Sequence, residues 1–146
     1  MDCPSCLSIS GKKRISPGPI IHDGKYWVVD HAYPTKLLGW LVIVLKRHVE
    51  ALHDLQSEEL EELGILQEKT TKFLRTTLSC KKEYIACFSE GKGFEHIHFH
   101  VIPKTKTITE DLKGPKVFTM LKANEIESIG KDEITKFSKL LRRKFT

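Results

Sequence analysis

The segment EHIHFHVIP, residues 95–103, places His96, His98 and His100 at alternate positions with apolar residues between them. Side chains alternate between the two faces of a strand, so this pattern predicts a row of imidazoles opposite a core-facing row. Imidazole is the commonest metal ligand and also suits nucleophilic attack or proton transfer near neutral pH. A merely solvated strand face would more commonly carry threonine, lysine or glutamate.

The spacing of the row favours an anionic ligand. Neighbouring histidines on a strand lie roughly 6.5 to 7 Å apart at their Cα atoms. Adjacent imidazoles can converge on one anionic group at that distance, whereas three of them cannot easily bind one metal ion. A phosphate in front of the row would meet donors from two histidines and an attacking nitrogen from the third.

A second candidate site is the pair Cys3 and Cys6 in the segment CPSC. A Cys-x-x-Cys pair supplies half of a zinc site or, where it opens a helix after a strand, a redox dithiol. A terminal pair without any role is the remaining alternative. Cys80 and Cys87 occur singly on apolar segments, which is typical of small core residues.

Periodicity predicts the elements that position these residues. KYWVVD (25–30) predicts a strand, and WLVIVL (40–45) predicts a central strand buried on both faces. The segment 57–78 predicts a long helix with Ser57 as its N-cap and an acidic start. EYIACFS (83–89) predicts a strand that pairs antiparallel with the histidine strand through a turn at 91–93.

The two ends of the chain are less regular. Residues 1–19 are rich in proline and glycine and predict a loop around the cysteines. Residues 107–130 give mixed signals. A final helix is predicted over residues 132–145, with four apolar residues on one face: Ile134, Phe137, Leu140 and Leu141.

Length and composition predict one globular domain. The chain has 146 residues, 40% hydrophobic and 29% charged, with no apolar run of the roughly 20 residues that a membrane-spanning helix needs. It lacks the features of a signal peptide, which makes the cytoplasm the expected location. The net charge of +5 comes from dispersed lysines and a basic tail, a distribution that makes nucleic acid an unlikely partner.

The motif His-Ile-His-Phe-His-Val-Ile, residues 96–102, resembles the pattern that names the histidine triad family of nucleotide hydrolases and transferases. Residues 39–60 are similar to that family's buried strand, its lysine-arginine-histidine turn and the start of its long helix. The resemblance covers residues 26–103 as a core and leaves 104–146 as a variable C-terminal extension. It implies an α+β fold with a mostly antiparallel sheet, and usually a homodimer.

The resemblance also implies roles for individual residues. His98 would attack the α-phosphorus of a nucleotide and form a nucleotidyl-histidine intermediate. His96 would fix the ring of His98 through its backbone carbonyl, and His100 would donate a hydrogen bond to phosphate oxygens. Asp30 falls near the acidic residue that such proteins place on the ribose.

Two departures from the family pattern bear on the substrate. Many members carry glutamine and serine or threonine where this chain has Lys92 and Gly93, which we expect to lie at the phosphate. Many also carry a histidine where this chain has Trp40. Both departures leave the nucleophile in place and bear on the leaving group.

The resemblance completes the metal site as well. Some triad proteins and the related uridylyltransferases bind structural zinc through an N-terminal Cys-x-x-Cys and two histidines. The matching residues here are Cys3, Cys6, His48 and His96, an S₂N₂ set that suits tetrahedral zinc. Zinc would then anchor residues 1–19. The remaining histidines, His22, His31 and His53, are predicted to be surface or loop residues, although His31 could line a nucleoside pocket.

Three functions follow from these patterns. The first is a hydrolase or nucleotidyltransferase acting on a nucleoside phosphoanhydride or phosphoramidate, with dinucleoside polyphosphates as one candidate class. The second is a nucleotide-binding or signalling module with little turnover, motivated by the two departures. The third, a zinc-stabilised nucleic-acid binder, leaves the histidine row unexplained and ranks last.

Overall fold

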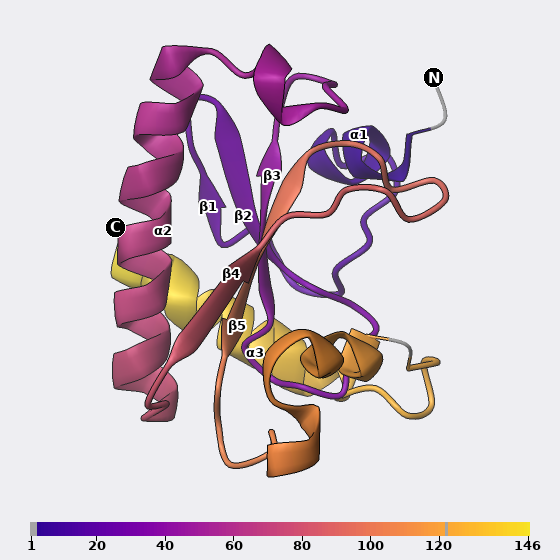
Figure 1. Ribbon diagram of the computed structural model, residues 1–146, viewed down its shortest axis with the longest axis vertical. Coiled ribbons are helices and arrows are strands. Elements are labelled where there is room, and N and C mark those ends of the chain that lie inside the picture. Colours follow the sequence, from indigo (N-terminus) through magenta and orange to yellow (C-terminus); the bar gives the residue numbers. More distant parts are fainter. Residues whose placement is uncertain (1–2, 122) are drawn as a thin grey trace.

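The computed structural model describes residues 3–121 and 123–146, which form an α+β fold around a five-stranded antiparallel sheet (Figure 1). The strand order is β1-β2-β3-β5-β4. The strands are β1 (His22–Asp23), β2 (Trp27–His31), β3 (Leu41–Leu45), β4 (Glu83–Ala86) and β5 (His98–Pro103). The predicted fold class and the antiparallel pairing of β4 with β5 are confirmed.

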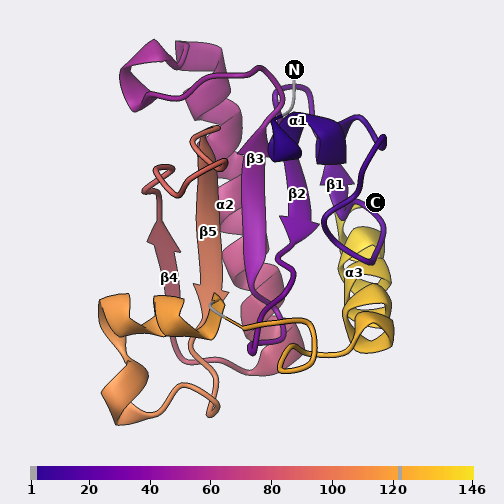
Figure 2. The same ribbon diagram turned by 90° about the vertical axis from the view of Figure 1, so that its right-hand side faces the viewer.

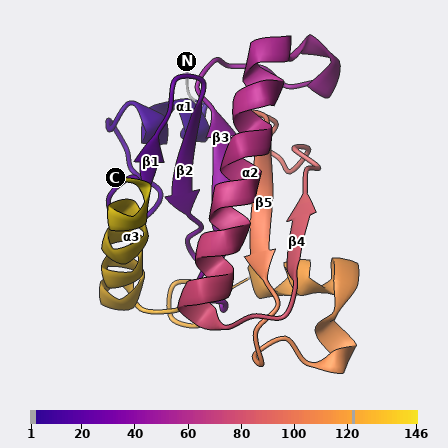
Figure 3. The ribbon, with the colours of Figure 1, turned by 90° about the vertical axis from the view of Figure 1, so that its left-hand side faces the viewer.

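One face of the sheet is the hydrophobic core under the long helix α2 (Ser57–Leu78). Figure 3 shows α2 lying along the sheet, with the C-terminal helix α3 (Lys131–Phe145) beside β1. The core side of β3 carries Leu41, Ile43 and Leu45, all fully buried. The apolar run at 40–45 therefore forms the predicted central strand, between β2 and β5.

The opposite face carries the histidines. Strand register places Asp30, Val42 and His100 in one row and Val28, Val44 and His98 in the next. Figure 2 views this face, where helix α1 (Pro4–Ile9) and the 3₁₀ helix η3 (Gly114–Leu121) lie at opposite ends. The site is therefore bounded by segments from both ends of the chain.

Helix α2 spans the predicted residues 57–78, but its N-cap differs from the prediction. Its N-cap is Gln56 and not Ser57, because Gln56 and Glu59 form a reciprocal capping box. The backbone N–H of Gln56 donates to the Glu59 carboxylate at 2.8 Å. Arg47 also donates to Glu59, at 2.9 Å, which ties the helix start to the turn after β3.

Other differences from the sequence prediction are local. Residues 4–9 form a helix and not a loop, with Pro4 at the first turn, where a missing N–H has no cost. Strand β5 starts at His98, because the N–H of Ile97 donates to Val49 outside the strand ladder. Strand β4 ends at Ala86, earlier than predicted, and β1 was not predicted.

The described residues of the C-terminal extension form two 3₁₀ helices and one α-helix. The 3₁₀ helices η2 (Glu110–Leu112) and η3 pack over a second apolar cluster that includes Trp40 and Ile102. Helix α3 confirms the predicted final helix, but Leu140 is exposed. At about 100° per residue, Leu140 is turned away from the buried Leu141. Within the described residues, no helix is both long and apolar enough to cross a membrane.

Candidate functional site

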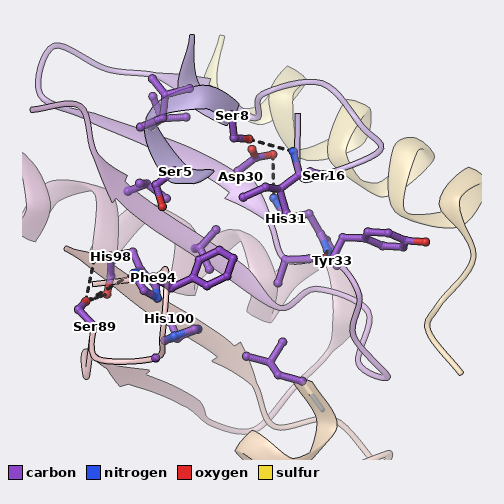
Figure 4. Close-up of a pocket in the computed structure, with 18 of the residues that line it drawn as sticks. Ser5, Ser8, Ser16, Asp30, His31, Tyr33, Ser89, Phe94, His98 and His100 are labelled. Atoms are coloured by element: carbon purple, nitrogen blue, oxygen red, sulfur yellow. Dashed lines mark hydrogen bonds between the residues drawn. The ribbon is translucent and has the colours of Figure 1, made fainter. Parts of the chain in front are cut away.

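A cavity of about 450 Å³ opens on the histidine face of the sheet (Figure 4). Strands β2, β3 and β5 form its floor, and α1, η3 and the loop after β4 form its walls. Its lining is largely apolar and includes three phenylalanines, Phe88, Phe94 and Phe118. A largely apolar cavity with a few polar groups on its floor is typical of a small-molecule site.

His98 lies on the floor with its ring held in one orientation. Its Nδ1 lies 2.7 Å from the backbone oxygen of His96. A carbonyl oxygen only accepts, so Nδ1 carries the proton and Nε2 of the neutral ring keeps its lone pair. The backbone N–H of His98 donates to Ser89 Oγ at 3.2 Å. A ring nitrogen with an available lone pair thus lies at the floor of the cavity.

His100 lies beside His98, with the two ring centroids 4.9 Å apart. Phe118 packs against the His100 ring at 4.9 Å, and Trp40 Nε1 donates to its Nδ1 at 2.9 Å. Burial, together with the nearby His98, lowers the pKa of His100 to about 3. His100 is therefore neutral at physiological pH.

His96 does not share the cavity with the other two histidines, contrary to the expectation of three imidazoles facing one phosphate. Its ring is buried and faces the cysteine pair. Its Nε2 lies 2.5 Å from the backbone oxygen of Leu45, so Nε2 carries the proton and the Nδ1 lone pair points at the sulfurs. The regular strand begins only at His98. The alternation of side chains therefore does not extend back to His96, whose ring points away from the cavity.

The predicted metal ligands Cys3, Cys6, His48 and His96 form one cluster, with all four ligand atoms within 4.8 Å of one another. The two Nδ1 atoms are 3.2 Å apart, and the three measured sulfur-to-nitrogen distances are 3.5, 3.5 and 3.6 Å. A tetrahedral zinc ion with normal bond lengths requires about 3.3 Å between nitrogens and about 3.6 Å between sulfur and nitrogen. The four residues fit such an ion.

The tautomers of the two histidines agree with this fit. His48 Nε2 lies 2.9 Å from the Glu50 carboxylate, and His96 Nε2 lies close to the backbone oxygen of Leu45. Each Nε2 therefore carries a proton, and the lone pair of each Nδ1 faces the centre of the cluster. A partner on the outer nitrogen is the usual arrangement for a histidine that binds a metal. Two inward lone pairs at 3.2 Å would otherwise repel each other, and a cation removes that cost.

Asp30 lines the cavity, but its carboxylate is already engaged. Arg14 donates to both oxygens, at 2.7 and 3.0 Å, and the backbone N–H of His31 donates at 3.1 Å. Arg14 also donates to the Gly18 carbonyl at 2.9 Å. The pair joins the N-terminal segment to β2, a contact that no local sequence pattern indicated, and it leaves Asp30 little free acceptor capacity for a ribose.

Lys92 and Gly93 lie on the exposed loop before β5 and outside the cavity lining. The same loop contributes Ser89, Glu90, Gly91 and Phe94 to that lining. That Lys92 and Gly93 contact the substrate stays a prediction. Among the described residues that line the cavity there is neither lysine nor arginine.

The three remaining histidines differ in burial. His31 is buried and not a surface residue, because both ring nitrogens bond to backbone groups: Nδ1 to the Ala32 oxygen at 2.7 Å and Nε2 to the Gly39 N–H at 2.9 Å. It lines the cavity as predicted. His22 is partly buried and stacks on Phe145 at 4.5 Å, whereas His53 is exposed, as expected.

Comparison with known proteins agrees with this geometry. Residues 3–113 match the family described as "Scavenger mRNA decapping enzyme C-term binding". No curated protein matches the chain. A zinc-bound histidine triad family protein from Mycobacterium smegmatis is similar over 99% of this chain and 96% of its own, at 18% identity and a TM-score of 0.69.

Two further solved structures extend the likeness. A histidine triad protein from Bradyrhizobium japonicum has a TM-score of 0.71 at 20% identity, over 88% of this chain and 90% of its own. The diadenosine triphosphate hydrolase of Plasmodium falciparum has a TM-score of 0.64 at 15% identity, over 86% of this chain and 75% of its own. At these identities the likeness establishes the fold.

Proposed function

The chain belongs to the histidine triad family, and on that basis we propose that it is a nucleotide hydrolase or nucleotidyltransferase. The single observation that carries this proposal is the 2.7 Å hydrogen bond from His98 Nδ1 to the His96 carbonyl, which leaves a lone pair on Nε2 at the floor of the cavity. The apolar walls of the cavity suit a nucleoside.

In the proposed reaction, Nε2 of His98 attacks the α-phosphorus of a nucleoside phosphoanhydride or phosphoramidate. The new P–N bond forms as the bond to the leaving group breaks, and the leaving group keeps that electron pair. The phosphorylated ring becomes cationic, and the His96 carbonyl stabilises it through the Nδ1 proton. Water or another acceptor then attacks phosphorus and releases His98. His100 donates a hydrogen bond to a phosphate oxygen.

We propose that Cys3, Cys6, His48 and His96 hold a structural zinc ion. Such an ion supplies no reaction step, and it fixes the geometry of its ligands. Cys6 belongs to α1, and α1 contributes Ser5, Ser8 and Ile9 to the cavity wall. Zinc would therefore anchor segment 1–19 to the core and hold one wall of the nucleoside site.

We propose residues 1–146 as one domain that acts as a homodimer in the cytoplasm. Strand β4 is an edge strand of the sheet and carries the exposed Ile85, which leaves that edge open for a second copy. Sedimentation of the purified protein would test the dimer.

A second candidate function is a nucleotide-binding module with little turnover. The described residues of the cavity lining include no lysine or arginine, which favours it, because cationic donors usually stabilise a developing phosphate charge. Tight nucleotide binding without product would support this alternative.

A mutant comparison tests the enzyme. The substrates are adenosine and guanosine phosphoramidates, dinucleoside polyphosphates and a cap dinucleotide, which the matching family description suggests. His98→Ala should abolish turnover with the fold intact, since it removes the nucleophile. His53→Ala is the matched control, because that side chain is exposed and outside the site. Normal hydrolysis by His98→Ala would refute the mechanism.

A further inference from the structure

A buried hydrogen bond joins Trp40 to His100 below the cavity. Trp40 Nε1 lies 2.9 Å from Nδ1 of His100, and the two rings are perpendicular with centroids 5.7 Å apart. Trp40 is fully buried, and His100 is 8% exposed. Position 40 is one of the positions at which the sequence departs from the pattern that its resemblance to triad proteins implies.

The chemistry of indole determines which nitrogen of His100 carries the proton. An indole N–H can donate a hydrogen bond and cannot accept one. Nδ1 of His100 must therefore present a lone pair to Trp40, and the single proton of the neutral ring must lie on Nε2. A histidine at position 40 would impose no such choice, since its nitrogens can donate or accept.

Nε2 of His100 faces the open cavity. It makes no hydrogen bond with the described residues, and the buried side-chain polar atoms without a partner among those residues are Thr77 Oγ1 and Ser138 Oγ. Since Nε2 is unpaired and absent from that buried set, it is accessible from the cavity that His100 lines. Its proton is available to a ligand.

The other neighbours of the ring leave this assignment unchanged. Phe118 packs against it at 4.9 Å from η3, and the strand partners across β3 and β4 are Val42 and Ala86. His98, at 4.9 Å, is the one titratable residue among these neighbours. No carboxylate is among them to favour a second proton on His100.

We propose that Trp40 is a positioning residue, whose indole N–H holds His100 as the neutral tautomer with its proton on Nε2, directed at the phosphate of the substrate. That the ligand is a phosphate rests on the proposed function, whereas the tautomer of the His100 ring does not. His100 then contributes one neutral donor.

Nitrogen NMR of the wild-type protein tests the state of the ring without any variant. Protein with ¹⁵N-labelled histidine is measured at pH 7, where protonated and lone-pair ring nitrogens have distinct chemical shifts. We expect Nε2 of His100 to carry the proton and Nδ1 to carry none. A proton on Nδ1, or a rapid mixture of the two tautomers, would overturn the proposal.

Two variants separate the hydrogen bond from packing. Trp40→Phe keeps an aromatic ring and removes the donor, so His100 should become a mixture of tautomers and kcat/KM should fall by about 3- to 10-fold. Phe118→Leu alters packing on the same ring and removes no hydrogen bond, so the tautomer should stay fixed. An unchanged tautomer in folded Trp40→Phe would contradict the role of Trp40.

This test is independent of the proposed activity. If no substrate is turned over but His100 of the wild type carries its proton on Nε2, the proposed function fails and the assignment of the ring stands. If turnover is normal but the proton lies on Nδ1, the assignment of the ring fails and the function stands.

Discussion

His96 holds His98 through its backbone carbonyl, at 2.7 Å from Nδ1, while its own side chain faces the cysteine pair. One residue thus belongs to the proposed zinc cluster and also supports the proposed nucleophile. Loss of the metal should therefore affect the fold of the N-terminal segment and the orientation of the His98 ring together.

Zinc content and stability test this link. We expect about one zinc per chain and a loss of roughly 3 kcal/mol on chelation, which would lower Tm by about 10 °C. Cys6→Ser should lose the metal, whereas Cys87→Ser should keep it, because Cys87 lies outside the cluster. Elemental analysis and calorimetry measure both effects. Stoichiometric zinc in Cys6→Ser would show that the cluster is not the binding site.

The pair Arg14 and Asp30 should contribute strongly to stability. Their side chains are 25% and 10% exposed, so Arg14→Ala leaves a mostly buried carboxylate without its partner. We expect a loss of about 3 kcal/mol in the free energy of unfolding. The control is Lys36→Ala, whose partner is Glu127 and whose side chain is 44% exposed; it should cost less than about 1 kcal/mol. Urea unfolding measures both variants, and equal losses would contradict the burial argument.

Stability should fall as the pH is lowered from neutral. Burial lowers the pKa of His31 to about 4, whereas an unfolded histidine titrates near 6.5. Between these values the unfolded chain binds a proton that the native protein does not, so the free energy of unfolding falls with falling pH. The expected loss from His31 is roughly 2 kcal/mol between pH 7 and pH 5. The lowered pKa of His100 acts in the same direction, and a flat profile from denaturant unfolding at each pH would refute this account.

Replacing either of two glycines by alanine should change the stability of the protein, in opposite directions at the two positions. Gly39 has φ +91°, and an added Cβ would lie 2.5 Å from Leu78 Cδ1, so Gly39→Ala should cost about 2 kcal/mol or more. Gly64 lies within α2 with no atom within 4 Å of an added Cβ, so Gly64→Ala should stabilise by about 0.5 to 1 kcal/mol. Thermal unfolding of both variants provides the measurement, and stabilisation by Gly39→Ala would contradict the close approach.

Local periodicity explains what could be predicted from the sequence. The alternation that placed His98 and His100 on one face, the apolar run of β3 and the amphipathic pattern of α2 are properties of short segments. The direction in which the His96 side chain points could not be derived from alternation. It depends on the backbone hydrogen bond from Ile97 to Val49, which lies outside the strand ladder. The resemblance to known triad proteins supplied the role of its carbonyl.

Long-range contacts explain most of what was missed. Arg14 contacts Asp30, which lies 16 positions later in the sequence, at 2.7 Å. Phe118 reaches His100 from a 3₁₀ helix, whose period lacks the 3.6-residue signal of an α-helix. His31 was predicted to be a surface or loop residue because it matched no partner pattern, and it is buried because backbone groups satisfy both ring nitrogens.

The most direct test of the nucleotidyl-histidine mechanism is to trap its intermediate. Protein is mixed with an α-labelled nucleotide substrate, quenched in alkali within one turnover, digested and analysed by mass spectrometry. We predict one nucleotidyl group on the peptide that contains His98, formed and lost fast enough to account for turnover and absent from His98→Ala. Turnover with no label on that peptide, or with label on another residue, would contradict the account.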